Sequence, residues 1–287
     1  MWTRKKFIQT GLMGLSAMGI GPWMLKTNEL TQFPYEPNQY NLDQYFPRYK
    51  DFSPMVPVWN VTPDIDRCIH RFHLSSPFSP SGRYLGLTRL LHEDRAPKPG
   101  EIAEIVLVDL LTGSQTIIAK TRGWDTQLGA QVQWGTTDEE LYYNDVDISS
   151  WRAYAIKLNP LTGEKKILNG TVYDVSPDGK WIVSTDLKSI GYTQSGYGVI
   201  VPKDQIIFNQ GASENDGVFV TNTETGKSRM IASYKKIVDQ CIPSIDIQKY
   251  GLVTFMDFIL CGIQKVVASC LYYDLYPTVV IEQNQCS

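Results

Sequence analysis

The chain has 287 residues, of which 43% are hydrophobic and 20% are charged, and its formal net charge at pH 7 is −3. This composition is typical of a folded protein with enough apolar side chains for a sizeable core, and its 16 tyrosines favour strands. Because the net charge is slightly negative and no nucleic-acid motif is visible, we expect no nucleic-acid partner, and a polyanionic ligand would need a locally basic pocket.

The first 25 residues have the layout of an export signal. Three basic residues at positions 4–6 precede an apolar run from Phe7 to Ile20, which is short for a membrane span. An N-terminal membrane anchor stays open as the alternative. Beyond this segment we expect no stable membrane span, and the predicted location is periplasmic or secreted. Residues 26–60 are rich in Pro, Tyr and Asn and are predicted to form a linker.

Residues 61–251 contain a repeat. One kind of unit occurs at 76–88, 132–145 and 173–186. It consists of a short run, a polar turn and an alternating apolar strand. A second kind, two strands around an Asp/Asn-x-x-Thr-Gly turn, occurs at 105–118, 153–168 and 217–231. Four strands in a period of about 50 residues are typical of a propeller blade, which buries its faces only by stacking on its neighbours. The sequence therefore predicts an all-β chain, a partial β-propeller of four-stranded antiparallel blades with one enlarged repeat between Asp186 and Gly217.

Residues 252–287 differ in character from the rest. No arginine follows Gly251, and three of the five cysteines (Cys261, Cys270, Cys286) lie in this tail. When the codons that could encode this tail are read in a shifted frame, they permit a sequence with another strand, turn and strand. Our hypothesis is therefore that the tail is aberrant and results from a frameshift. A genuine apolar C-terminal segment is the alternative.

Four blocks of the sequence resemble a known family. Residues 76–113, 122–147, 170–184 and 196–202 resemble the propeller polysaccharide lyases of the ulvan-lyase kind, and more distantly the oligogalacturonate lyases. The likeness covers about residues 68–246. It implies a seven-bladed parent, of which this chain holds about four blades and is therefore truncated. It also implies an acidic polysaccharide as substrate, and we expect no cofactor.

Propeller geometry indicates where a site would lie. Residues at the starts of innermost strands, and residues that follow second strands, line the central funnel. The first group contains His73, Gln131 and Tyr173. The second contains Arg89, His92, Asn144 and Lys188. A funnel with these side chains suits an acidic sugar.

The chemistry suited to such residues is β-elimination from a uronate. A cation neutralises the carboxylate, while a base removes the neighbouring proton and an acid protonates the leaving oxygen. The resemblance implies that Tyr173 acts as base and acid together with His73. Lys188 stands near the place of the family's arginine, although lysine lacks the bidentate fork. The predicted catalytic residues are Tyr173, His73 and Lys188, and the predicted substrate-binding residues are Arg89, His92, Gln131 and Asn144.

Each of these residues also has a structural interpretation, such as a tyrosine packed between blades or an arginine paired with a nearby acid. No metal site is predicted, because three histidines and scattered cysteines have no ligand spacing, and no nucleophile elbow or nucleotide-binding loop occurs. Two functions remain. The first is an exported, ulvan lyase-like polysaccharide lyase, inactive if truncation has removed what it needs. The alternative is a non-catalytic propeller that binds a glycan or a protein.

Overall fold

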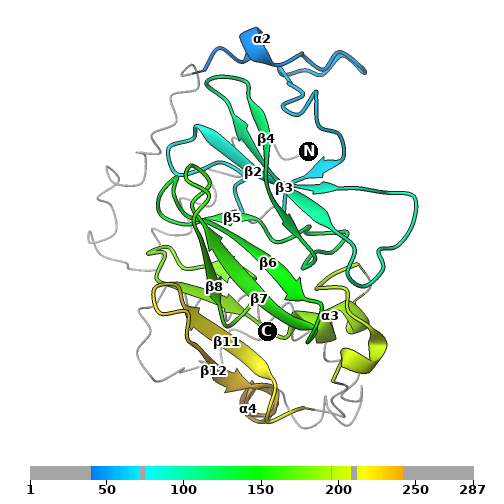
Figure 1. Cartoon of the computed structure of the whole chain (residues 1–287), viewed down its shortest axis with the longest axis vertical. Coiled ribbons are helices and arrows are strands. Elements are labelled where there is room, and N and C mark those ends of the chain that lie inside the picture. The colour runs from blue at the N-terminus through cyan, green and yellow to red at the C-terminus, as the bar shows by residue number, and fades with distance from the viewer. Residues whose placement is uncertain (1–39, 72–74, 195, 208–211, 242–287) are drawn as a thin grey trace, which may run out of the picture. The chain divides into compact units, whose positions relative to one another are not determined.

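The computed structural model describes residues 40–71, 75–194, 196–207 and 212–241 (Figure 1). The chain divides into Met1–Gln39 and Tyr40–Ser287, and all described residues belong to the second unit. The predicted export signal, the tail from residue 252 and His73 lie outside the described residues. The predictions made for them stay predictions.

Twelve strands of the described chain form three antiparallel sheets of four strands, each in sequence order. The first sheet contains β1 (Cys68–Ile69), β2 (Tyr84–Leu90), β3 (Ala103–Asp109) and β4 (Gln115–Thr121). The second contains β5 (Gln133–Trp134), β6 (Leu141–Asp147), β7 (Arg152–Leu158) and β8 (Lys165–Leu168). The third contains β9 (Asp174–Val175), β10 (Trp181–Ser184), β11 (Gly217–Asn222) and β12 (Ser228–Ser233). The all-β class and the four-stranded units are confirmed. The described residues hold three such units, where about four blades were expected.

The Thr-Gly turns join the third and fourth strands of each sheet, as the repeat predicts. Gly113, Gly163 and Gly226 all have positive φ, between 74° and 81°, and each donates its N–H to the Asp or Asn four residues earlier. The side chain of that Asp or Asn accepts N–H groups from the turn itself, for example from Glu224 and Thr225 to Asn222. Glycine is required because the left-handed conformation is costly for other residues.

Alternation along the strands sorts the side chains of the first sheet onto two faces. On one face, Leu85 pairs with Val108 and Leu87 with Val106, and these residues pack against Phe46 and Ile65 of the preceding segment. The described part of the predicted linker therefore covers this sheet, and it includes the short helix α2 (Leu42–Tyr45). The other face, which includes Ile105, packs against the second sheet.

The second sheet lies between its two neighbours. Leu141 and Tyr143 of β6 belong to the cluster shared with the first sheet. Tyr142, the residue between them, packs with Val172 and Ile182 of the third-sheet region. The core is therefore a series of apolar layers between successive sheets, which is the packing that the repeat predicts.

Two further helices follow strands of the third sheet along the chain, α3 (Leu187–Thr193) after β10 and α4 (Tyr234–Cys241) after β12. α3 begins in the enlarged repeat, where the Asp186 side chain accepts the N–H of Lys188, and a 3-10 turn follows at Lys203–Gln205. α4 packs Ile237 and Val238 on the third sheet. Among the described residues no helix is long and apolar enough to cross a membrane.

Candidate functional site

The first strands of the three sheets meet at one buried guanidinium. Arg71 follows β1, Gln131 precedes β5 and Tyr173 precedes β9. Arg71 Nε donates to Gln131 Oε1 over 2.9 Å, and its NH2 group donates to the backbone oxygen of Tyr173. The Arg71 side chain is 5% exposed, and its Cζ lies 5.1 Å from the centre of the Tyr173 ring. One cation therefore joins all three sheets and lies over the tyrosine that the sequence predicts to be catalytic.

A tight turn places Gln131 against Arg71. The Asp125 side chain begins the turn by accepting the N–H groups of Gln127 (2.9 Å) and Leu128 (2.5 Å) through Oδ1. Gln131 has a φ of +60°, which is uncommon for a residue with a side chain, and its N–H donates to Leu128 O. Gln131 is 1% exposed, and its Nε2 has no hydrogen-bond partner among the described residues. The fold thus holds a strained, buried amide directly beside Arg71.

Three ionisable groups act on the charge of Arg71: Asp174, Tyr173 and Asp125. Burial lowers the pKa of the guanidinium, and these three groups oppose that effect. Arg71 NH1 lies 3.9 Å from Asp174 Oδ1, and the Asp174 side chain is 43% exposed. Desolvation raises the pKa of Asp174, and the desolvation of Asp125 is stronger and raises its pKa to about 7. We call Arg71, Asp125, Gln131, Tyr173 and Asp174 the Arg71 cluster.

Tyr173 packs near α3, and Lys188 belongs to this helix. The N–H of Tyr173 donates to Val183 O over 2.8 Å, and the ring packs beside a cluster that contains Leu187 and Ile190 of α3. Lys188 is the second residue of α3, and its Nζ donates to Gln205 O over 3.4 Å. The catalytic roles predicted for Tyr173 and Lys188 stay predictions.

Asn144 links the second and third sheets. Its Nδ2 donates to Val172 O over 2.7 Å and its Oδ1 accepts the N–H of Val172 over 2.8 Å. Asn144 is 0% exposed. This geometry gives Asn144 a structural role directly before Tyr173, and its predicted contact with a sugar stays a prediction.

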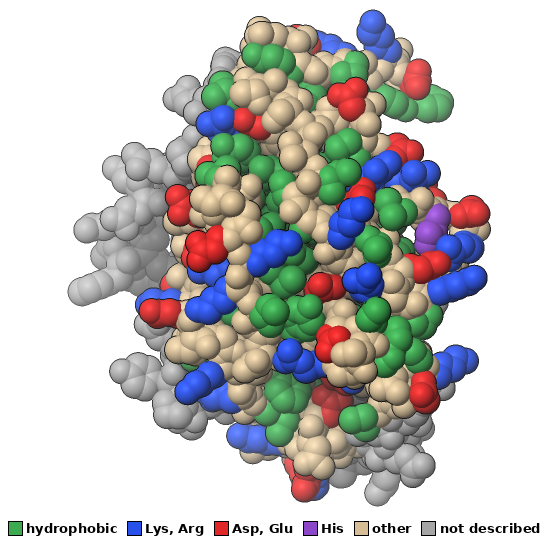
Figure 2. Space-filling model, viewed as in Figure 1, with side chains coloured by type: hydrophobic (Ala, Val, Ile, Leu, Met, Phe, Trp, Pro, Cys, Tyr) green, Lys and Arg blue, Asp and Glu red, His purple; other side chains and the backbone are tan. Residues whose placement is uncertain are grey.

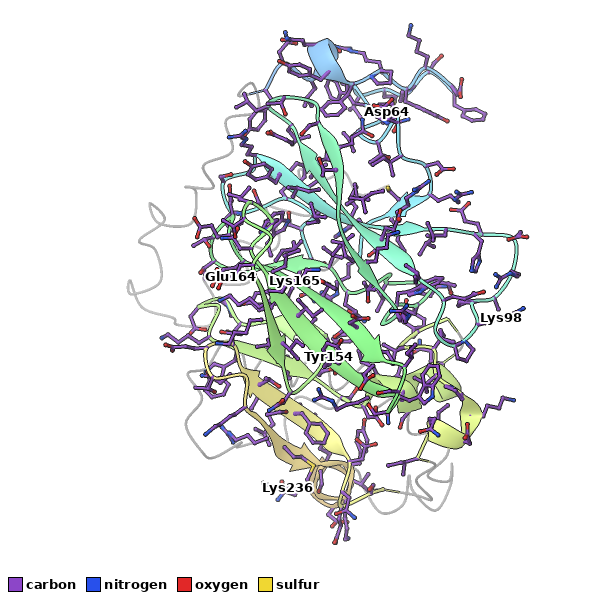
Figure 3. The ribbon with its side chains drawn as sticks, in the orientation of Figure 1. Asp64, Lys98, Tyr154, Glu164, Lys165 and Lys236 are labelled. Carbon is purple, nitrogen blue, oxygen red and sulfur yellow. The ribbon has the colours of Figure 1, made fainter. Side chains whose placement is uncertain are left out.

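Arg89 and His92 are engaged with carboxylates near the end of β2. Arg89 donates to Asp66 over 2.8 Å and to Glu104 over 3.0 Å. His92 Nε2 lies 2.9 Å from a Glu101 oxygen, and its ring meets the Trp124 ring edge-on at 5.9 Å. Glu101 closes the loop between β2 and β3, at whose outer side Lys98 lies (Figure 3). These contacts hold both side chains against carboxylates, and their predicted role in sugar binding stays a prediction.

Sequence reasoning missed Arg71 and Asp125. For Arg71 a signal existed, since alternation along a strand places residues 71 and 73 on the same side. For Asp125 no local signal exists, because its burial depends on residues distant in the sequence. Within the described ranges no group of three or more His, Cys, Asp or Glu side chains is arranged to hold a metal ion.

Comparisons with known proteins find likeness at the level of structure. No family model and no curated protein matches the sequence. Oligogalacturonate lyase in complex with manganese is similar at 19% identity and a TM-score of 0.43, over 66% of this chain and 47% of that chain. An oligogalacturonate lyase from Vibrio parahaemolyticus is similar at 17% identity and a TM-score of 0.42, with the same coverage of 66% and 47%. TolB from Acinetobacter baumannii is similar at 14% identity and a TM-score of 0.33, over 66% and 49% of the two chains. The chain spans about half the length of these proteins.

Proposed function

We propose that this chain is an exported polysaccharide lyase of the ulvan-lyase kind, periplasmic or secreted, that cleaves uronic-acid glycans by β-elimination. In this proposal the three sheets are blades of a β-propeller whose parent has seven, and the Arg71 cluster lies in its funnel. The observation that carries the proposal is the buried Arg71 guanidinium over the Tyr173 ring, where the first strands of all three sheets meet.

The proposed reaction needs a base beside a cation. Tyr173 in its phenolate form takes the proton next to the uronate carboxylate, the bond to the leaving glycosidic oxygen breaks, and the phenol returns a proton to that oxygen. Arg71 supplies the positive charge, since its Cζ lies 5.1 Å from the centre of the Tyr173 ring. His73 and Lys188 neutralise the substrate carboxylate, so the electron pair left by the proton is stabilised as the double bond forms.

The face of the molecule in Figure 2 supports a local rather than a broad recognition of the acidic glycan. Acidic and basic side chains alternate over this face, with no large area of one sign. A polyanion would therefore gain little from the general surface and would depend on a few placed cations.

A second candidate function is a non-catalytic propeller that binds a glycan or a protein. One observation favours it: the hydrogen bonds that Arg71 donates within the described residues go to Gln131 and to the backbone of Tyr173. In this case the cation stabilises the junction of the three sheets, and Tyr173 is part of a binding surface.

The test is the ultraviolet absorbance of unsaturated uronate product, measured with the 287-residue chain on ulvan and on polygalacturonate separately. We expect product from the unaltered chain and a loss of turnover of about 10²-fold or more in Tyr173→Phe, because the ring stays but the proton-carrying oxygen is removed. Tyr154→Phe is the matched control, since Tyr154 lies on β7, in the middle sheet (Figure 3), and we expect it to keep full turnover. Binding without product supports the second candidate, whereas neither product nor binding contradicts both.

A further inference from the structure

We infer that Asp174 is a displaceable counter-ion of Arg71, and that a uronate carboxylate takes its place on the guanidinium when the glycan binds. Arg71 is then a further substrate-binding residue, and Asp174 determines how strongly the site prefers an acidic sugar to a neutral one. This inference rests on the proposed function, because the uronate is the substrate of the proposed reaction.

The fold uses the three nitrogens of the Arg71 guanidinium differently. Nε donates to Gln131 Oε1 over 2.9 Å, and NH2 donates to the backbone oxygen of Tyr173. NH1 lies 3.9 Å from Asp174 Oδ1, which is an ion-pair distance but too long for a hydrogen bond. Among the residues that the structure describes, NH1 therefore has an ionic partner and no hydrogen-bond acceptor.

Asp174 lies at the water-exposed edge of the Arg71 cluster. Its side chain is 43% exposed, whereas the Arg71 side chain is 5% exposed. Asp174 Oδ1 accepts the N–H of Val175 over 3.0 Å, and this local bond does not involve Arg71. A carboxylate that water reaches gains little from an ion pair, because water solvates it almost as well. Asp174 can therefore turn toward water at small cost, while the guanidinium stays where Gln131 and Tyr173 hold it.

The proposed chemistry requires a carboxylate-binding cation beside the base. In β-elimination the proton is taken from the carbon that carries the carboxylate, so the base and this cation must be neighbours. Arg71 Cζ lies 5.1 Å from the centre of the Tyr173 ring. NH1 carries two N–H donors, so it can bind a carboxylate oxygen while Nε and NH2 keep their contacts. Arg71 thus meets this requirement in addition to the cations predicted from the sequence.

These contacts make Asp174 a competitor of acidic sugars. Before binding, its charge compensates the Arg71 guanidinium, which would be costly to leave buried without an anion. A uronate brings its own carboxylate and compensates Arg71 in the same way, whereas a neutral sugar leaves Asp174 in place. An acidic sugar must therefore bind against the resident charge, and removal of that charge should strengthen its binding.

The test measures binding to the 287-residue chain by calorimetry at low ionic strength, where charges are screened least. The acidic probes are oligomers of ulvan and of polygalacturonate, measured separately, and the neutral probe is an oligomer of galactose. Asp174→Asn keeps an oxygen for the Val175 N–H and removes only the charge. We expect an acidic probe to bind about fivefold more tightly to Asp174→Asn, which is the effect of one unit charge at about 4 Å in water, and the affinity for the neutral probe to stay unchanged.

Asp178→Asn is the matched control for the change in net charge. The Asp178 side chain is 44% exposed and forms an ion pair with Lys180 over 3.4 Å. Asp178→Asn should leave both affinities within about twofold of the unaltered chain, because surface charges of this kind act weakly. Arg71→Lys keeps a cation but has no NH1 group, so the gain from Asp174→Asn should be lost in the double variant. Should the double variant not fold, the comparison of Asp174→Asn with Asp178→Asn still decides.

The possible results separate this inference from the proposed function. Unchanged or weaker binding of the acidic probes to Asp174→Asn overturns the inference, as does an equal gain in Asp178→Asn or a full gain in the double variant. Tighter binding to Asp174→Asn without unsaturated product from any variant supports the counter-ion role and contradicts the lyase. Product formation with no effect of Asp174→Asn on binding contradicts the inference alone. Absence of binding of both acidic probes to every variant contradicts both.

Discussion

At the scale of single residues, the polar side chains inside the molecule are used to join sheets. Asn144 imitates a backbone pair by donating to and accepting from Val172, and it is fully buried. Arg71 holds the next residue along by donating to the carbonyl oxygen of Tyr173. Val172 and Tyr173 are consecutive, so the position of Tyr173 is fixed both by Asn144 of the second sheet and by Arg71, which follows the first strand of the first sheet.

Asn144→Asp should destabilise the chain strongly near neutral pH. The carboxylate offers no N–H to Val172 O, and its charge is buried without a partner, which costs at least about 2 kcal/mol. Asn222→Asp is the control, because Asn222 uses its oxygen only as an acceptor in a Thr-Gly turn, where Asp109 stands in the first sheet. Chemical unfolding of both variants is the measurement. Equal stability of the two variants would contradict the role that we assign to Asn144.

At the scale of elements, the turn between the first and second sheets is shaped by contact with β2. Gly129 has a φ of +61°, and a Cβ at this position would lie 2.5 Å from Thr88 Oγ1 and 2.6 Å from Thr88 Cβ. Thr88 Oγ1 also accepts the N–H of Ala130 over 3.1 Å. The turn that carries Asp125 and Gln131 is therefore held in place from the first sheet.

Gly129→Ala should be more destabilising than Gly163→Ala. Both substitutions put a side chain at positive φ, which costs roughly 1–2 kcal/mol, but a Cβ on Gly163 has nothing within 4 Å. The excess in Gly129→Ala is due to Thr88, so Thr88→Ala should reduce it in the double variant. Thermal unfolding of the four variants measures this coupling, and an excess that Thr88→Ala leaves unchanged would argue against it.

Some of the strands, turns and helices could be predicted from the sequence, and others could not. The Thr-Gly turns and the alternating strands were predictable because both depend on residues close together in the chain. α3 and α4 were not predicted, since one lies in the enlarged repeat and the other is a short helix stabilised by packing on the third sheet. In the candidate site, Tyr173 and Gln131 were expected near one another, whereas the burial of Asp125 arises only from long-range contacts.

At the scale of the whole described unit, the first and third sheets each have one face that does not pack on the second sheet. Another segment of the chain covers each of these two faces. The segment with Phe46 and Ile65 packs on the first sheet, and Tyr234, Ile237 and Val238 of α4 pack on the third. Apolar faces that would otherwise be open are thus covered by the chain itself, which reduces the tendency to associate.

Phe46→Ala should expose the outer face of the first sheet. Phe46 is 3% exposed and packs with Leu85, Leu87 and Val106, so its truncation should cost about 3–5 kcal/mol. Phe52→Ala is the control, because Phe52 is 97% exposed and its truncation should change stability by less than about 0.5 kcal/mol. Unfolding and binding of a hydrophobic dye are the measurements, and equal behaviour of both variants would contradict a covering role for the segment.

The order of the sheets has a consequence for how the molecule opens. Each four-stranded unit is assembled from consecutive strands, and apolar clusters join each unit to the next one along the chain. Such an array resembles a stack in which cooperativity passes only between neighbours, so the ends separate before the middle does. Amide hydrogen exchange should therefore be slowest in β6 and β7, which have a sheet on either side, and faster in the strands of the first and third sheets. Because Arg71 ties the first strands of all three sheets together, removing it should make exchange at the two ends faster and independent of each other.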